Sequence, residues 1–216
     1  MKKCPYCGAE VEDEAIFCPE CGSRIAEAAP VPKAAPAPLA GPVPFFEKLW
    51  RAAMLDGSLY RQVENDPTAI THAAMAIILI NVCSGIGALI NYHLTVGGMP
   101  MLNMITALVT QIVYALIKWG ILTLCVWLVG VKLLGGKADL PETARTIAFA
   151  YSPVILQIIG VPIVYQILLV ATNVWMVIAL KVAVTEALDI PPSRAWATVI
   201  IGGILYMLLT ALLLLE

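Results

Sequence analysis

The C-terminal two thirds of the chain consist of long apolar segments separated by short polar or proline-containing breaks. A helix needs about 20 apolar residues to cross the ~30 Å hydrocarbon core of a bilayer. The pattern predicts five transmembrane helices, at residues 69–92, 113–133, 143–160, 163–180 and 195–215. We therefore expect an all-α integral membrane domain over residues 67–216.

The second apolar segment, residues 101–134, is too long for one simple crossing. In its first part, apolar residues at helical spacing lie opposite a polar face made of Asn103, Thr106, Thr110 and Gln111. This spacing predicts an amphipathic lead-in on the outer surface, followed by a crossing that begins near Val113. Only Val161 and Pro162 separate the third and fourth segments, which predicts a tight transmembrane hairpin.

The basic residues fall on one side of this arrangement. With the N-terminus inside, the internal segments hold twelve Lys and Arg residues, whereas the outer loops at 93–101 and 160–162 hold none. Cytoplasmic loops of membrane proteins carry an excess of Lys and Arg, so we expect a cytoplasmic N-terminus and an outside C-terminus. No secretory signal follows Met1, which agrees with this orientation.

An amphipathic segment at residues 45–66 precedes the first span. Helical spacing places Phe45, Phe46, Leu49, Trp50 and Ala53 on one face, opposite Glu47, Lys48 and Arg51. One interpretation is a short helix that lies in the headgroup region. The other is a helix that packs on the cytoplasmic end of the bundle, and the sequence does not separate the two.

Composition supports the membrane assignment and marks a boundary. Hydrophobic residues make up 60% of the chain and charged residues 13%, against roughly 25% charged in a soluble domain. Residues 1–66 hold 17 of the 28 charged side chains, so the polar part of the chain ends where the apolar segments begin. A net charge of −2 provides no basic field, and we expect no nucleic acid partner.

Four of the six cysteines occur in two copies of one motif, Cys4-Pro5-Tyr6-Cys7-Gly8 and Cys18-Pro19-Glu20-Cys21-Gly22. Two Cys-x-x-Cys pairs with ten residues between them predict a structural zinc site with four cysteine ligands, in a ribbon over residues 1–25. Two disulfides would require an oxidising compartment, which a cytoplasmic N-terminus does not offer. An iron centre uses the same motif, and the spacing does not distinguish iron from zinc.

The predicted ribbon is acidic outside its thiolates, so it would repel phosphate, which favours a protein-binding or a purely structural role. The doubled motif resembles the short zinc ribbons at the N-termini of many prokaryotic membrane proteins, which implies a prokaryotic cytoplasmic membrane. Residues 26–44 contain six prolines in nineteen positions. This composition predicts an extended, semi-rigid tether between the ribbon and the membrane domain.

Several short motifs in the membrane region have a familiar order. They are Ala52-Ala53-Met54-Leu55-Asp56, Leu133-Leu134-Gly135-Gly136-Lys137 and Ala148-Phe149-Ala150-Tyr151-Ser152-Pro153. Over about residues 48–215, this order resembles the Yip1 family of five-span membrane proteins. The resemblance implies a five-helix bundle with a cytoplasmic N-terminus. Eukaryotic members of that family are tied to vesicle traffic and small GTPases, whereas the ribbon and tether here look prokaryotic.

Few polar side chains lie inside the predicted spans. Lys118 is the only formally charged residue well inside one, and Gln157 and Gln166 flank the outer turn at a similar depth. Together the three form a candidate intramembrane polar site. Two alternatives stay open for Lys118, namely a side chain that snorkels to the outer interface or one that has a polar partner inside the bundle.

Two classes of function remain after this inspection. The sequence contains no HExxH motif, no glycine-rich phosphate loop and no GxSxG motif, so we expect no enzyme. The favoured hypothesis is a membrane scaffold or adaptor whose ribbon binds a cytoplasmic protein. The alternative is a small oligomeric transporter or channel that uses the polar residues near Lys118, and a homo-oligomer is compatible with both.

Overall fold

The computed structural model describes residues 2–3, 10–11, 20, 43–98 and 100–213. The chain divides into two compact units, Met1–Gly41 and Pro42–Glu216. In the first unit, β1 (Lys2–Lys3) pairs antiparallel with β2 (Glu10–Val11), and Lys3 lies opposite Glu10. The two strands belong to the predicted ribbon.

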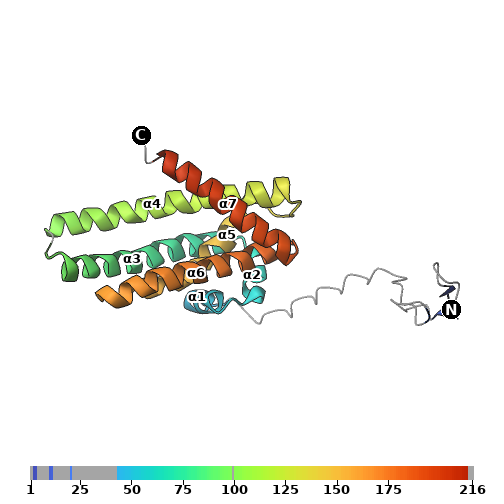
Figure 1. Ribbon diagram of the computed structural model, residues 1–216, viewed down its shortest axis with the longest axis horizontal. Coiled ribbons are helices and arrows are strands. Elements are labelled where there is room, and N and C mark those ends of the chain that lie inside the picture. Colours follow the sequence, from blue (N-terminus) through green and yellow to red (C-terminus); the bar gives the residue numbers. More distant parts are fainter. Residues whose placement is uncertain (1, 4–9, 12–19, 21–42, 99, 214–216) are drawn as a thin grey trace. The chain divides into compact units, whose positions relative to one another are not determined.

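Four long apolar helices make up most of the second unit (Figure 1). They are α3 (Ala69–Thr95), α4 (Met101–Trp127), α6 (Pro162–Ala187) and α7 (Pro192–Leu213). A π-helical segment, η1 (Leu128–Leu133), continues α4, so the helix runs from Met101 to Leu133 without a break at Val113. By length and composition, four helices are candidate membrane spans, over Ala69–Thr95, Met101–Leu133, Pro162–Ala187 and Pro192–Leu212. The prediction of an all-helical, multi-pass membrane domain is confirmed.

The third predicted span, residues 143–160, is a broken element rather than one regular helix. α5 (Leu140–Ala150) begins at a capping box between Asp139 and Glu142, and the 3-10 helix η2 (Ser152–Ile158) follows it. Pro153 lies in the first turn of η2 and has no backbone N–H to donate, which favours the end of the α-helix at this point. The segment is not one of the four long apolar helices, so a fifth span is not confirmed.

Two short helices, α1 (Phe45–Ala53) and α2 (Gly57–Glu64), pack against α5, α6 and η2. Leu49 and Ala52 of α1 are buried, and so is Lys48, which helical spacing had placed on a polar face. Phe46 and Trp50 are 72% and 66% exposed. The α1 helix therefore packs on the bundle through Lys48, Leu49 and Ala52, while Phe46 and Trp50 stay outside.

Small residues let α3 and η2 approach closely. A Cβ atom on Gly87 would overlap the carbonyl oxygen of Gln157, and one on Gly160 would overlap the side chain of Ile90 and the carbonyl oxygen of Gly87. Small residues at helix interfaces permit backbone contact of this kind in membrane bundles. The contact holds the end of η2 against the second half of α3.

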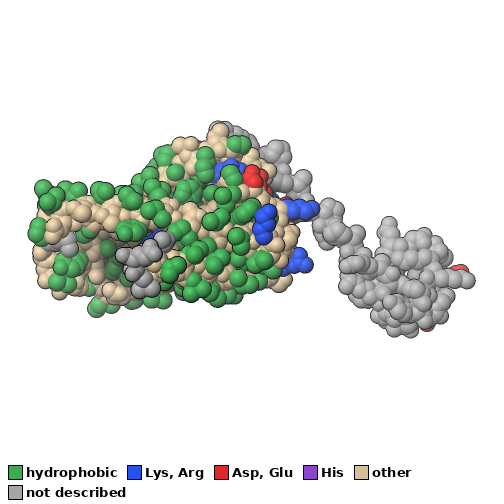
Figure 2. Space-filling view, turned by 90° about the horizontal axis from the view of Figure 1, so that it is seen from above, with side chains coloured by type: hydrophobic (Ala, Val, Ile, Leu, Met, Phe, Trp, Pro, Cys, Tyr) green, Lys and Arg blue, Asp and Glu red, His purple; other side chains and the backbone are tan. Residues whose placement is uncertain are grey.

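The surface of the second unit is mostly apolar. Figure 2 shows hydrophobic side chains over most of the visible face of the bundle, with the Lys, Arg, Asp and Glu side chains gathered mainly at one end. Exposed isoleucine, valine and leucine side chains lie along all four long helices. A surface of this kind fits contact with lipid rather than with water.

Candidate functional site

The predicted zinc ligands Cys4, Cys7, Cys18 and Cys21 lie outside the described residues. The pairing of β1 with β2 closes the chain on both sides of the first Cys-x-x-Cys motif, so that residues 4–9 connect two antiparallel strands. A donor set of four thiolates is the one that a structural zinc ion takes. Elsewhere, residues 43–98 and 100–213 contain no group of three or more His, Cys, Asp or Glu side chains that suits a metal.

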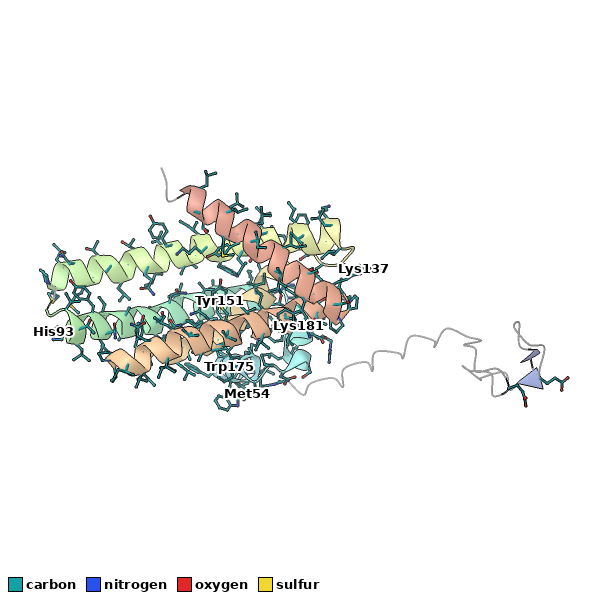
Figure 3. All side chains as sticks on the ribbon, viewed as in Figure 1. Met54, His93, Lys137, Tyr151, Trp175 and Lys181 are labelled. Carbon is teal, nitrogen blue, oxygen red and sulfur yellow. The ribbon has the colours of Figure 1, made fainter. Side chains whose placement is uncertain are left out.

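The α1 helix is tied to α6 through an indole. Trp175, near the middle of α6, donates its Nε1–H to the carbonyl oxygen of Ala53 at 2.9 Å. Figure 3 shows Trp175 and Met54 on the same side of the bundle, whereas His93 and Lys137 mark its opposite ends. The last turn of α1 is therefore fixed along the side of the bundle.

Cationic side chains hold α2 against the bundle. The Arg145 guanidinium is buried and donates to the carbonyl oxygens of Val63 and Glu64, at the C-terminal end of α2. Arg61 of α2 pairs with Glu186 of α6. Positive charge at a helix C-terminus satisfies its unpaired carbonyls and the helix dipole. These contacts join α2 to the helices α5 and α6 of the membrane unit.

The start of the first long helix is fixed by a second polar cluster. The Lys48 ammonium lies 3.6 Å from a carboxylate oxygen of Asp66 and 3.4 Å from Nδ1 of His72. The hydroxyl of Thr68 donates to Asp66 and, with Lys48, lowers the pKa of that carboxyl. Lys48 is thus buried with a charged partner, which is how a lysine is tolerated inside a protein.

A similar balance fixes the turn between α1 and α2. Burial raises the pKa of Asp56, but hydrogen bonds from Ser58 and Arg51 outweigh burial and leave that pKa lowered. Asp56 also caps α2, because its side chain accepts from the backbone N–H of Ser58. The ionised carboxylate therefore supports both the cap and the turn.

Gln157 is the centre of a hydrogen-bonded network inside the bundle. The residue is only 3% exposed. Its Oε1 accepts from the Ser84 hydroxyl at 2.8 Å, and its Nε2 donates to the Thr172 hydroxyl oxygen at 2.7 Å. Thr172 in turn donates to the carbonyl oxygen of Leu168. The network joins α3, η2 and α6 next to the broken element.

Lys118 lies in different surroundings. It is exposed on α4, with its ammonium 6.0 Å from the centre of the Tyr114 ring. With Asn81 of α3 and Gln111 of α4, it lines an open cavity of about 520 Å³ between these helices. Gln166 is exposed on α6. Lys118 and Gln157 therefore have separate sets of partners, and the three polar residues chosen from the sequence do not share one set of contacts.

Sequence reasoning missed Ser84, Thr172 and Arg145 as groups that hold the bundle together. Hydroxyl residues are common in membrane helices, and apolar periodicity does not say which of them face a partner. Arg145 was counted only as a basic residue of an internal loop, although its position four residues after Pro141 placed it on the first turns of a helix. No pattern in the sequence assigned its acceptors.

The geometry defines a helical multi-pass membrane protein with two short helices, α1 and α2, packed on its bundle and a separate N-terminal unit. A zinc-ribbon domain model matches residues 3–25, and a Yip1 domain model matches residues 57–214, well over half of the chain. The chain belongs to the Yip1 domain family. No curated protein and no solved structure matches it.

Proposed function

We propose that this chain is a non-enzymatic membrane adaptor. Its membrane domain anchors a cytoplasmic zinc ribbon at a prokaryotic cytoplasmic membrane, and the ribbon binds a protein partner there. The observation that carries this proposal is the combination of a zinc-ribbon domain and a Yip1 domain in one chain. Zinc ribbons of this size commonly serve as structural units, because four thiolates leave no open metal position for a substrate.

The ribbon holds one structural zinc ion through Cys4, Cys7, Cys18 and Cys21. A segment of about 22 residues is too small for a core of its own, so the ion supplies the folding free energy. Its acidic surface suits a basic or neutral protein face rather than a phosphate backbone. The tether at residues 26–44 spans up to about 59 Å if it is fully extended as polyproline II, at ~3.1 Å a residue. The ribbon can thus reach a partner well away from the bilayer.

The membrane domain crosses the bilayer five times, with α5 and η2 together as the third crossing. Eleven α-helical residues at ~1.5 Å and seven 3-10 residues at ~2.0 Å give about 30 Å, the thickness of the hydrocarbon core. Figure 3 supports this arrangement, because Tyr151 at their junction lies between the levels of Lys137 and His93. Five crossings put the two termini on opposite sides, and the basic residues of the inner segments favour a cytoplasmic N-terminus and an outside C-terminus.

The transporter hypothesis has less support. It required Lys118, Gln157 and Gln166 to act in one zone, but Gln157 has Ser84 and Thr172 as partners and Lys118 faces the α3–α4 cavity. A polar group with both of its amide ends engaged in hydrogen bonds is better suited to join helices than to bind a passing solute.

The adaptor function is tested by proximity labelling in the native cell with a ligase fused to the N-terminus. The test variant is Cys4→Ser/Cys18→Ser, and the matched control is Cys83→Ala/Cys125→Ala, which removes two cysteines of the membrane unit. We expect a defined set of cytoplasmic proteins with the wild type and the control, and its loss with the ribbon variant at equal membrane abundance. Identical labelling by all three proteins would contradict the proposal.

A further inference from the structure

Polar side chains make up most of the lining of the cavity between α3 and α4, together with Ala107 and Ala115. Thr110, Tyr114 and Lys118 follow each other at four-residue spacing on α4, Gln111 lies three residues before Tyr114, and Asn81 of α3 lines the same cavity. Residues at this spacing lie on the same face of a helix. Gln111 donates through Nε2 to the backbone carbonyl of Asn81 at 3.2 Å, which fixes the inner wall of the cavity.

The ammonium of Lys118 is not balanced by a carboxylate in the described part of the chain. Lys48, Arg51 and Arg61 pair with carboxylates elsewhere in the membrane unit, and residues 69–133 contain no Asp or Glu. The Lys118 ammonium lies beside the ring of Tyr114. A charged side chain without a counter-ion is costly at membrane depth. An anion that enters the cavity would therefore be attracted by the Lys118 ammonium.

The depth of Lys118 indicates which anions can reach it. Lys132 lies 5.2 Å from the Trp127 ring, and Trp beside Lys is typical of a membrane–water interface. Lys118 is about 21 Å from Lys132 along the helix, at ~1.5 Å a residue. In a core of ~30 Å, it is then about 9 Å from the opposite interface. Tyr114 and Thr110 lie on the path from that interface to the ammonium.

We propose that this cavity binds a phosphate group, with Lys118 as its cationic partner. The hydroxyls of Tyr114 and Thr110 are hydrogen-bond donors on the same face of α4, and a phosphate accepts several such bonds at once. The cavity is open on one side and has a volume of about 520 Å³, which accommodates a headgroup entering from the side. The two sources of this chemistry at such a depth are the phosphodiester of an anionic lipid and free inorganic phosphate. This site is independent of the adaptor function and of the ribbon.

The experiment uses the full-length protein, delipidated in detergent, with binding measured by native mass spectrometry. One arm titrates phosphatidylglycerol and the other titrates sodium phosphate. We expect Lys118→Met to lower the affinity about tenfold, Lys118→Arg to retain it, and Tyr114→Phe to lower it about threefold, since charged hydrogen bonds contribute more than neutral ones. Gln166→Leu, an exposed polar position on α6, is the matched control and should change nothing.

The two arms separate the sources. A loss confined to phosphatidylglycerol identifies a lipid headgroup, and a loss confined to sodium phosphate identifies a soluble anion. Unchanged affinity in both arms for Lys118→Met would overturn the proposal. If Lys118→Met does not fold, Tyr114→Phe decides the question, because wild-type affinity in that variant for both ligands would also overturn it.

Discussion

Gln157 and Gln166 flank the same turn, yet the structure gives them opposite roles. Gln157 is 3% exposed and joins three elements, whereas Gln166 is exposed on the surface of α6. Replacing each glutamine by leucine therefore compares the loss of a buried, hydrogen-bonded amide with the loss of an exposed one. We expect Gln157→Leu to destabilise the protein and Gln166→Leu to leave its stability within about 0.5 kcal/mol of the wild type.

The size of the Gln157→Leu effect follows from its two hydrogen bonds. Interhelical hydrogen bonds in membrane proteins are each worth about 0.6 kcal/mol on average and about 1.7 at most. The loss of the amide affects its two partners unequally. Thr172 keeps its hydrogen bond to the carbonyl of Leu168, while the Ser84 hydroxyl must donate to a carbonyl in its own helix. We therefore expect a loss of about 1–2 kcal/mol.

The assay is reversible unfolding of the full-length protein in mixed micelles, followed by helical content. Thr172→Val alone and combined with Gln157→Leu completes a double-mutant cycle, for which we expect a coupling of about 0.5–1 kcal/mol. Lys118→Met and Gln157→Leu should be additive, since they have separate partners. Equal stability of Gln157→Leu and Gln166→Leu would refute the argument that the network holds η2 in place.

The remaining predictions concern packing, the α2 helix and the metal. Gly87→Ala should destabilise the protein by more than about 2 kcal/mol in the same unfolding assay, because its Cβ overlaps a backbone carbonyl, whereas Gly203→Ala, with open space around it, should be neutral. Arg145→Met should cost about 2 kcal/mol and speed hydrogen exchange of α2, since two carbonyls lose a charged donor; unchanged exchange would contradict this role. Elemental analysis should find one zinc per wild-type chain and none in Cys4→Ser/Cys18→Ser; equal metal content would exclude these ligands.

The long helices were predictable because length and apolar composition alone define them, and Pro162 and Pro192 mark two of their starts in the sequence. The division of the third segment into α5 and η2 was not predictable, although Pro153 indicated a bend. The close approach of η2 depends on Gly87, which lies more than 60 residues earlier in the chain. Apolar periodicity carries no information on such a pairing.

The candidate site shows the same limit. Lys118 and Gln157 stood out because polar residues are rare in the spans, but their partners were not predictable, since Ser84 and Gln157 are 73 residues apart. Helical spacing placed Lys48 on a polar face, yet Asp66 and His72 provide polar partners that allow its burial. Which face of an amphipathic helix packs depends on the elements that it meets.

The five-span arrangement, and with it the side of the membrane on which the C-terminus lies, depends on whether α5 and η2 cross the bilayer. The direct measurement is labelling of Val161→Cys and Lys137→Cys, one on each side of this segment, with a membrane-impermeant maleimide in intact cells. Both positions are exposed, and a permeant maleimide controls for reactivity. A crossing predicts that Val161→Cys is labelled from outside and Lys137→Cys only after the cells are opened. Labelling of both positions from the same side would contradict the crossing and, with it, the five-span arrangement.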